Sequence, residues 1–244
     1  MNEMLNISGD GKRILFFGRA KCDASAELLD KLIRYSFDVT YVKSQVRGEK
    51  LPEDILSWEG DYIICYRSLY ILPKALLNKV KIAAINFHPA PPEYPGSGCI
   101  NFALYDEVRE YGVTAHIMNE VLDNGEILEV RRFPVTPCDD LPSILARTHK
   151  ELSNLCSDFI SGIHTEGDQI IKRKLAYSNK ESWNGKARLL KELEDLQKIN
   201  LNISKDTLKR IVRATYIEGH PPMIELHGFK FYLKLDNKRI KAFK

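Results

Sequence analysis

The sequence lacks the patterns that would indicate a metal centre, a disulfide scaffold or a membrane span. Its five cysteines, at positions 22, 65, 99, 138 and 156, include no Cys-x-x-Cys pair and are odd in number, which argues against a complete disulfide framework and favours a reducing cytoplasm. Six histidines show no paired zinc spacing, so we expect no metal. No apolar run approaches a membrane span and the N-terminal residues have no signal-peptide core, so we expect no membrane partner.

The chain also has little net charge. The 36 Lys and Arg residues nearly balance the 33 Asp and Glu residues, which leaves a net charge of +3. This small charge does not indicate a nucleic-acid groove, and we expect no nucleic-acid partner. A hydrophobic content of 44% in 244 residues is ordinary for a globular protein with one sizeable core and room for an appendage.

Apolar segments alternate with helical patterns through the first part of the chain. The order predicts a doubly wound, mostly parallel α/β sheet. Strands are expected at 13–18, 37–42, 62–66 and 82–86, and helices at 23–35 and 73–79. No Gly-x-Gly-x-x-Gly follows Gly18, so a dinucleotide fingerprint is absent. Arg19, next to this strand end, is placed either to meet a ligand phosphate or to serve as an exposed structural arginine.

The later elements are expected to complete this domain and add an appendage. A helix at 100–107, strands at 112–118 and 126–135, and a long helix from Leu141 follow in order, the last with Asp139 and Asp140 before it and Pro142 in its first turn. A polar connection over 174–187 predicts a boundary, with a catalytic domain at 1–175 and an appendage at 176–244. The appendage is expected to hold helix formers at 187–198, a helix capped by Ser204, and a hairpin turning at His227 and Gly228.

Two polar side chains stand where the fourth apolar strand ends. Asn86 and His88 are two residues apart, so in a strand they face the same space. Prolines and glycines over 89–98 then form an irregular loop, and such loops bind ligands in open α/β sheets. Asp123 occupies a polar loop between two later strands.

An amide, an imidazole and a carboxylate form a workable set for acyl transfer. The amide stabilises an oxyanion, the imidazole moves a proton, and the carboxylate orients the imidazole. Each residue also has a structural alternative: Asn86 satisfying loop backbone groups, His88 as a hydrogen-bonded structural histidine, and Asp123 within a turn. Cys99 nearby is interpreted as a small apolar filler rather than a nucleophile.

Three separated motifs resemble one family. Asn86-Phe-His-Pro89, Gly112-Val-Thr-Ala-His116 and Leu122-Asp-Asn-Gly-Glu-Ile-Leu128 look like the signature of the Rossmann-like formyltransferases that use 10-formyltetrahydrofolate. The resemblance covers roughly residues 12 to 165. It implies that Asn86, His88 and Asp123 are catalytic and that 10-formyltetrahydrofolate is the cosubstrate.

The resemblance also implies binding residues. The segment 66–73 is similar to the family's folate-pocket border, so Leu69, Tyr70, Ile71, Val121 and Asp123 are expected to bind the folate. The acceptor is expected to contact residues of the proline-rich loop and of the segment 213–222, which resembles the C-terminal part of sugar N-formyltransferases. These acceptor candidates are Tyr94, Gly96, Ser97, Arg213 and Tyr216. An aromatic packing the joint between the domains is the alternative for Tyr216.

Within the family, the bacterial sugar N-formyltransferases are the most similar group. The short C-terminal appendage and the low net charge disfavour the methionyl-tRNA formyltransferases, and glycinamide ribonucleotide formyltransferases lack such an appendage. The expected acceptor is a nucleotide-linked amino sugar, dTDP-4-amino-4,6-dideoxyglucose for O-antigen synthesis, with the base, epimer and amine position left open. The alternatives are a methionyl-tRNA or glycinamide ribonucleotide formyltransferase and a non-catalytic nucleotide-sugar or folate binding protein. The resemblance also implies a homodimer, and the cysteine usage predicts a cytoplasmic location.

Overall fold

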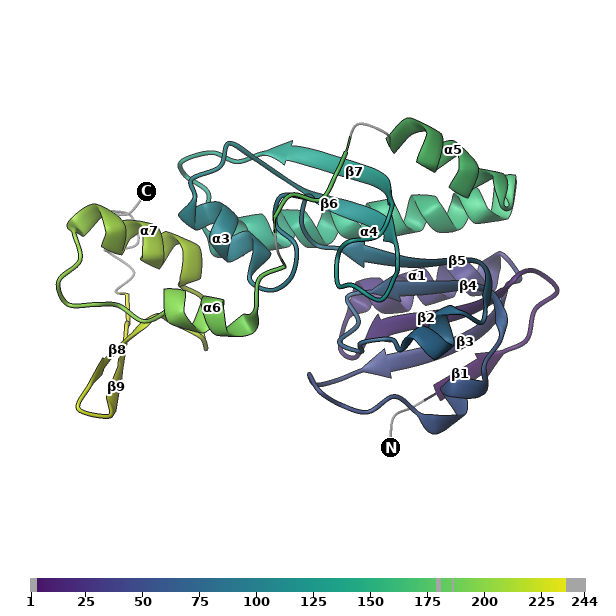
Figure 1. The fold of residues 1–244 in the computed structure, drawn as a ribbon, viewed down its shortest axis with the longest axis horizontal. Coiled ribbons are helices and arrows are strands. Elements are labelled where there is room, and N and C mark those ends of the chain that lie inside the picture. The colour runs from purple at the N-terminus through teal and green to yellow at the C-terminus, as the bar shows by residue number, and fades with distance from the viewer. Residues whose placement is uncertain (1–3, 179–180, 186, 236–244) are drawn as a thin grey trace.

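A seven-stranded sheet organises the larger part of the molecule (Figure 1). The structure is a computed structural model and describes residues 4–178, 181–185 and 187–235. Its strands run in the order β1-β3-β2-β4-β5-β6-β7. Their bounds are Met4–Ile7 for β1, Arg13–Arg19 for β2, Asp38–Ser44 for β3, Gly60–Tyr66 for β4, Val80–His88 for β5, Glu110–Ile117 for β6 and Ile127–Pro134 for β7.

The centre of the sheet is parallel and its edges are antiparallel. Strands β3, β2, β4 and β5 pair in parallel, whereas β1 pairs antiparallel with β3, and β6 and β7 continue antiparallel from β5. The expected mostly parallel α/β sheet is therefore confirmed. The antiparallel return of β6 has a consequence for the site, because it brings its side chains opposite those at the carboxyl end of β5.

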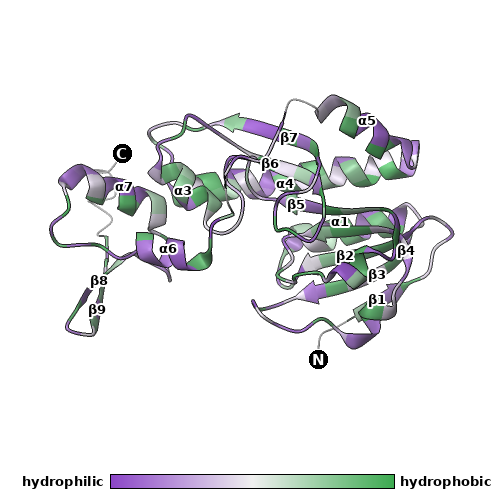
Figure 2. Cartoon of the chain, viewed as in Figure 1, coloured by the Kyte–Doolittle hydropathy of each residue, from purple (hydrophilic) through white to green (hydrophobic). Residues whose placement is uncertain are grey.

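Helices cover both faces of the central strands, which explains why these strands are continuously apolar. Ile14 and Phe16 of β2 pack into a core with helices α1 (Asp23–Arg34) and α4 (Leu141–Glu166). Their neighbours Leu15 and Phe17 point to the other face, towards the 3₁₀ helix η1 (Glu53–Ser57) and helix α2 (Lys74–Leu77). The coloured ribbon shows the same concentration of apolar residues in the central strands (Figure 2).

The long helix begins where the sequence predicts. The Asp140 carboxylate accepts a hydrogen bond from the Ser143 backbone N–H at 3.0 Å, and the Ser143 hydroxyl lies 2.9 Å from the Asp140 backbone N–H, which forms a capping box. The capping box fixes where α4 begins, and its apolar stripe fixes which face of the helix packs against the sheet. Among the described residues, no helix is both long and apolar enough to cross a membrane.

Three elements were not expected from the sequence, namely η1, β1 and α5 (Gln169–Ser178). Strand β1 adds residues 4–7 to the sheet edge, although their pattern is weak. Helix α5 occupies the first part of the segment 174–187, which was expected to be an extended polar connection. Ile170 and Ile171 bury in the main core, so tertiary packing stabilises a helix whose own sequence is mostly polar.

The C-terminal elements agree with their sequence patterns. They are α6 (Leu190–Leu196), α7 (Lys205–Thr215), β8 (Met223–Leu226) and β9 (Phe229–Tyr232). Ser204 caps α7 by accepting from the Thr207 N–H at 3.1 Å. His227 and Gly228 have φ of 51° and 82°, as a two-residue hairpin turn of type I′ requires. Helix α7 lies against α3 (Cys99–Tyr105), which follows the proline-rich loop, so the appendage is joined to the neighbourhood of the site.

Candidate active site

The carboxyl end of β5 supplies two of the predicted site residues. Asn86 and His88 leave the strand on the same side, as their spacing predicts. Strand β6 runs antiparallel beside them, and its register sets His116 directly opposite Asn86. The Asn86 side-chain nitrogen lies 3.1 Å from His116 Nε2. Because His116 Nδ1 faces the Ile117 carbonyl oxygen at 2.9 Å and donates to it, His116 Nε2 accepts from the Asn86 amide.

Asp123 reaches the same place from the loop between β6 and β7. One carboxylate oxygen, Oδ2, accepts a hydrogen bond from the Gly96 N–H at 2.9 Å and lies 3.3 Å from His88 Nδ1. The other, Oδ1, lies 3.4 Å from the Asn86 amide nitrogen and 3.5 Å from His116 Nε2. The structure therefore brings together the amide, imidazole and carboxylate that the sequence singled out.

The loop that carries Asp123 is held tightly. Asp123 has a φ of 46°, a left-handed conformation that a short polar side chain tolerates. Two residues later, a Cβ on Gly125 would lie 1.7 Å from the Ile117 carbonyl oxygen, so only glycine fits there. The indole N–H of Trp183 donates to the Gly125 carbonyl at 2.7 Å. These contacts fix the position of the loop and therefore the position of the Asp123 carboxylate in the site.

The carboxyl of Asp123 and the imidazole of His88 are buried, and each changes the pKa of the other. Asp123 is 6% exposed, and although burial raises the pKa of its carboxyl, His88, His116 and the Gly96 N–H lower it more, to about 2. Burial lowers the pKa of His88 from its ordinary value, against the opposing effects of Asp123 and of the Tyr94 carbonyl. His88 Nε2 donates to that carbonyl at 3.0 Å. The neutral ring therefore carries its proton on Nε2 and keeps Nδ1 as the basic nitrogen.

Cys99 belongs to the packing of the site. Its thiol donates to the Gly96 carbonyl at 3.0 Å, and burial raises its pKa to about 12. A thiol with so high a pKa supplies no thiolate at neutral pH. Its interpretation as a small filler agrees with this environment.

A cavity of about 500 Å³ opens beside these residues. The expected folate-binding residues Leu69, Tyr70, Ile71, Val121 and Asp123 all line it. Ile71 is 86% exposed and Val121 58% exposed, so both apolar side chains are available to cover a ligand. Two separate loops, after β4 and after β6, thus line the same cavity, and folate binding there stays a prediction.

The expected acceptor residues divide into two groups. Gly96 and Ser97 line the cavity. Tyr94 contributes its carbonyl to His88, while its hydroxyl donates away from the cavity to Asp106 at 3.0 Å. Arg213 donates to the Asp139 and Thr136 carbonyls, which ties α7 to the start of α4, and Tyr216 follows the end of α7. Neither Arg213 nor Tyr216 lines the cavity in this structure.

Two aromatic residues of the site were given no role from the sequence. His116 is part of a quoted motif, and strand alternation beside Asn86 could have identified it once the β5–β6 register was known. Trp183 belongs to the polar connection after α5, where no local pattern indicates a site. Its ring lies edge-on at 4.9 Å from the His116 ring and 5.8 Å from the His88 ring. Trp183 therefore closes one side of the histidine pair.

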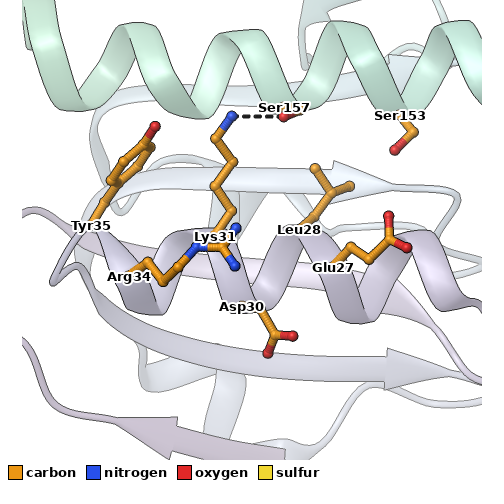
Figure 3. A pocket seen from close by; sticks show the side chains of 8 residues that line it. All are labelled: Glu27, Leu28, Asp30, Lys31, Arg34, Tyr35, Ser153 and Ser157. Carbon is orange, nitrogen blue, oxygen red and sulfur yellow. Dashed lines mark hydrogen bonds between the residues drawn. The ribbon is translucent and has the colours of Figure 1, made fainter.

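A second cavity, of about 450 Å³, lies between α1 and α4 (Figure 3). Lys31 from α1 donates to the Ser157 hydroxyl of α4 at 2.7 Å across it. Its lining includes none of Asn86, His88 and Asp123, so it is not the candidate active site. Within the described ranges, no group of three or more His, Cys, Asp or Glu side chains is arranged to hold a metal ion.

Known proteins resemble this chain in sequence and in fold. The sequence model of the family described as "Formyl transferase" matches residues 13–160. Methionyl-tRNA formyltransferase from Listeria innocua is 32% identical over 127 residues, which are 50% of this chain and 41% of the relative. The chain thus spans less than half the length of that curated relative.

Two solved structures cover nearly the whole chain. A 4-N formyltransferase from Francisella tularensis has a TM-score of 0.68 at 18% identity and matches 92% of this chain and 97% of its own. An N-formyltransferase from Helicobacter canadensis, solved with folinic acid and dTDP-3-aminofucose, has a TM-score of 0.65 at 15% identity over 89% and 85% of the two chains. At these identities the structures establish a shared fold. The match of the family model over residues 13–160, more than half of the chain, shows that this chain belongs to the formyl transferase family.

Proposed function

We propose that this protein transfers the formyl group of 10-formyltetrahydrofolate to the amine of a nucleotide-linked amino sugar. The observation that carries the proposal is the convergence of Asn86, His88 and Asp123 at the wall of one cavity. A folate-binding protein without activity does not require this set. Dideoxy sugars of surface polysaccharides are the proposed class, with dTDP-4-amino-4,6-dideoxyglucose and O-antigen synthesis as the specific proposal.

The site geometry supports a direct transfer. The neutral acceptor amine attacks the formyl carbon, and the Asn86 amide donates to the oxyanion that develops. His88 Nδ1 takes the proton that the amine releases, directly or through a water, because Nε2–H is already committed to the Tyr94 carbonyl. Asp123 stabilises the imidazolium from 3.3 Å. The carbon–nitrogen bond to folate N10 then breaks, N10 receives a proton, and the formamide is released.

His116 has a positioning role in this proposal. Its Nε2 accepts from the Asn86 amide, so the amide nitrogen rather than the amide oxygen faces the site. Both amide hydrogens of Asn86 have acceptors in this structure, His116 Nε2 at 3.1 Å and Asp123 Oδ1 at 3.4 Å. In the proposal, the hydrogen of the longer contact, to Asp123, is the one that turns to the oxyanion. The proposal therefore assigns the oxyanion donor to Asn86 and the orientation of that donor to His116.

The acceptor class has two candidates. Similarity over 89% of this chain to the Helicobacter canadensis protein, which was solved with dTDP-3-aminofucose, supports an amino sugar. Sequence identity to methionyl-tRNA formyltransferase favours a tRNA acceptor as the second candidate. The net charge of +3 gives little of the phosphate attraction that tRNA binding requires, so we prefer the sugar.

Mass spectrometry of the products tests the proposal. The protein is incubated with 10-formyltetrahydrofolate and, in turn, dTDP-linked and GDP-linked 4-amino sugars, a dTDP-linked 3-amino sugar, glycinamide ribonucleotide and methionyl-tRNA. A mass gain of one formyl group on a sugar nucleotide is expected, and it should accumulate at least about 100-fold more slowly with an Asn86→Ala control. Formylation of the tRNA or ribonucleotide alone would overturn the acceptor assignment, and folate binding without any product would overturn catalysis.

The remaining assignments are part of the same proposal. Residues 1–175 are proposed as the catalytic domain and residues 176–244 as the appendage, and α5 extends three residues past that boundary, to Ser178. Tyr94, Gly96 and Ser97 remain the proposed acceptor contacts, together with Arg213 and Tyr216, which would require α7 to approach the bound substrate. A cytoplasmic location also remains a prediction.

A homodimer through the hairpin is a further part of the proposal. Phe229, Phe231 and Tyr232 of β9 are 71%, 56% and 61% exposed, which leaves an apolar surface available to a second copy. Light scattering tests this prediction. The wild-type protein is expected at twice the mass of a Phe229→Ser, Phe231→Ser variant, and a monomeric wild type would overturn it.

A further inference from the structure

Three arginines and one histidine gather in the cavity beside the proposed catalytic residues. Arg19 ends β2, Arg67 directly follows β4, Arg47 lies in the loop after β3, and His149 projects from α4. All four line the same cavity as Asn86 and His88. Their strands are parallel, so the arginines meet at the carboxyl edge of the sheet, where open α/β sheets bind ligands.

The positive charge of these arginines is not neutralised within the cavity. Over residues 4–178, 181–185 and 187–235, none of the three forms an ion pair with a carboxylate. Two acids also line the cavity, but Glu120 pairs with Lys74 at 2.5 Å and Asp123 is engaged by the histidines. Three guanidinium groups therefore line one cavity without a carboxylate partner among the described side chains.

The proximity of like charges lowers the pKa values of two of these side chains. Burial together with the neighbouring charges of Arg67 and Arg47 lowers the pKa of Arg19. Burial together with Arg67 and Arg19 lowers the pKa of His149 to about 4. Each cation thus disfavours the charge of its neighbours, and a bound oxyanion would reverse that effect.

Local backbone geometry holds this arrangement in place. Arg67 has a φ of 53°, a conformation that is costly for an arginine and persists only where the surroundings require it. Its guanidinium contacts the Cys22 sulfur at 3.5 Å, at the start of α1. Cys22 provides no side-chain cap for that helix, so the positive end of the helix adds to the charge of the arginines.

We infer that Arg19, Arg67, Arg47 and His149 form an oxyanion subsite that binds the multiply charged end of a substrate. The inference rests on the proposed function, because the subsite shares a cavity with the proposed formyl-transfer site. Planar guanidinium groups bind phosphate and carboxylate oxygens through paired hydrogen bonds. Both the diphosphate of a nucleotide-linked acceptor and the glutamate carboxylates of the folate have this chemistry.

Binding measurements on charge-removing variants test the subsite. Isothermal titration calorimetry is performed with inorganic pyrophosphate, with thymidine diphosphate and with folinic acid, on the wild type and on Arg19→Gln and Arg67→Gln. Arg34→Gln is the control, because Arg34 lies towards the other end of α1 and lines the second cavity (Figure 3). Each subsite variant is expected to weaken binding of its anion about tenfold, as the loss of a charge-assisted contact does. The control is expected to bind within about twofold of the wild type.

The pattern among the probes identifies the source of the anion. Weaker binding of pyrophosphate and thymidine diphosphate, with unchanged folinic acid, assigns the subsite to the acceptor. Weaker binding of folinic acid alone assigns it to the folate tail. Equal binding by the wild type and both variants, with thermal melts that show folded proteins, would overturn the subsite.

The binding test also separates the subsite from the proposed function. Pyrophosphate and thymidine diphosphate binding requires no formyl transfer. Arginine-dependent binding in a protein that formylates no acceptor would retain the subsite and reject the enzyme. The opposite result is formyl transfer to a sugar nucleotide with a KM that is unchanged in both Arg19→Gln and Arg67→Gln. That result would retain the enzyme and reject the subsite.

Discussion

Asp123→Asn removes the one negative charge among the proposed catalytic residues. Its carboxylate is 6% exposed, with a pKa of about 2 instead of the ordinary 3.8. One pKa unit corresponds to about 1.4 kcal/mol, so the ionised carboxylate contributes about 2 kcal/mol to the free energy of unfolding at pH 7. An asparagine keeps the shape but cannot carry this charge. The variant is therefore expected to be about 2 kcal/mol less stable than the wild type at pH 7.

The sign of the pH dependence follows from the lowered pKa. A carboxyl whose pKa falls on folding stabilises the protein above the pKa of the unfolded chain, and this contribution disappears as pH falls through the pKa of the folded state. The difference in the free energy of unfolding between the wild type and Asp123→Asn should thus be equal at pH 7 and pH 5. At pH 3 it should be about half as large, because the unfolded carboxyl is then mostly protonated.

Urea unfolding followed by circular dichroism at pH 7, 5 and 3 measures this difference. Asp30→Asn is the matched control, because Asp30 is an exposed aspartate on α1, away from the histidines of the site. It should change stability by less than about 0.5 kcal/mol at each pH. Equal stability of wild type and Asp123→Asn at pH 7, or a difference that does not change down to pH 3, would refute the coupling between Asp123 and the histidines.

The same substitution has a kinetic consequence. Removing the carboxylate takes away the interaction that favours protonated His88, so the pKa of His88 falls further. The acid limb of the profile of kcat/KM against pH should therefore move to lower pH. The maximal rate should fall by about 100-fold or more, because the proton acceptor loses its stabilising partner. A limb that moves to higher pH would contradict the assignment of His88 as the base.

Three further substitutions test separate parts of the site. Asn86→Ala removes the oxyanion donor and should lower kcat by about two to three orders of magnitude with nearly unchanged folate binding; wild-type turnover would remove Asn86 from the mechanism. Gly125→Ala places a Cβ 1.7 Å from the Ile117 carbonyl oxygen, so the free energy of unfolding should fall by about 1–3 kcal/mol in urea titrations; an unchanged value would mean that the loop readjusts. Trp183→Phe removes the N–H that donates to Gly125 and should cost about 1 kcal/mol and shift kcat. Trp58→Phe is its control, because the buried Trp58 N–H has no partner among the described residues; equal effects of the two changes would show that only ring size matters.

The sequence predicted the central fold because local patterns and tertiary environment agree there. The apolar run before Asn86 has the length and composition of a buried strand, and β5 occupies it. Asp140, Pro142 and the apolar stripe after them specify the start and inner face of α4. The pattern failed for α5, whose sequence is mostly polar and whose helix depends on two isoleucines reaching the core.

The site was only partly accessible to sequence reasoning. Two-residue alternation placed Asn86 beside His88. The approach of Asp123 instead required the antiparallel return of β6 and β7, which no local spacing specifies. Arg213 was expected at the site but lies elsewhere. Its guanidinium donates hydrogen bonds to the carbonyls before α4, so it joins α7 to α4 away from the cavity.

By itself, the sequence determined the strands and helices of the core, the spacing of Asn86 and His88, and the chemistry that an amide, an imidazole and a carboxylate can perform. Only the tertiary structure decided which distant residues join them. The β5–β6 register set His116 against Asn86, the connection after α5 brought Trp183 over both histidines, and the parallel strand ends gathered the arginines. These are contacts between residues far apart in the chain, and they follow from strand register and helix packing, which local periodicity does not specify.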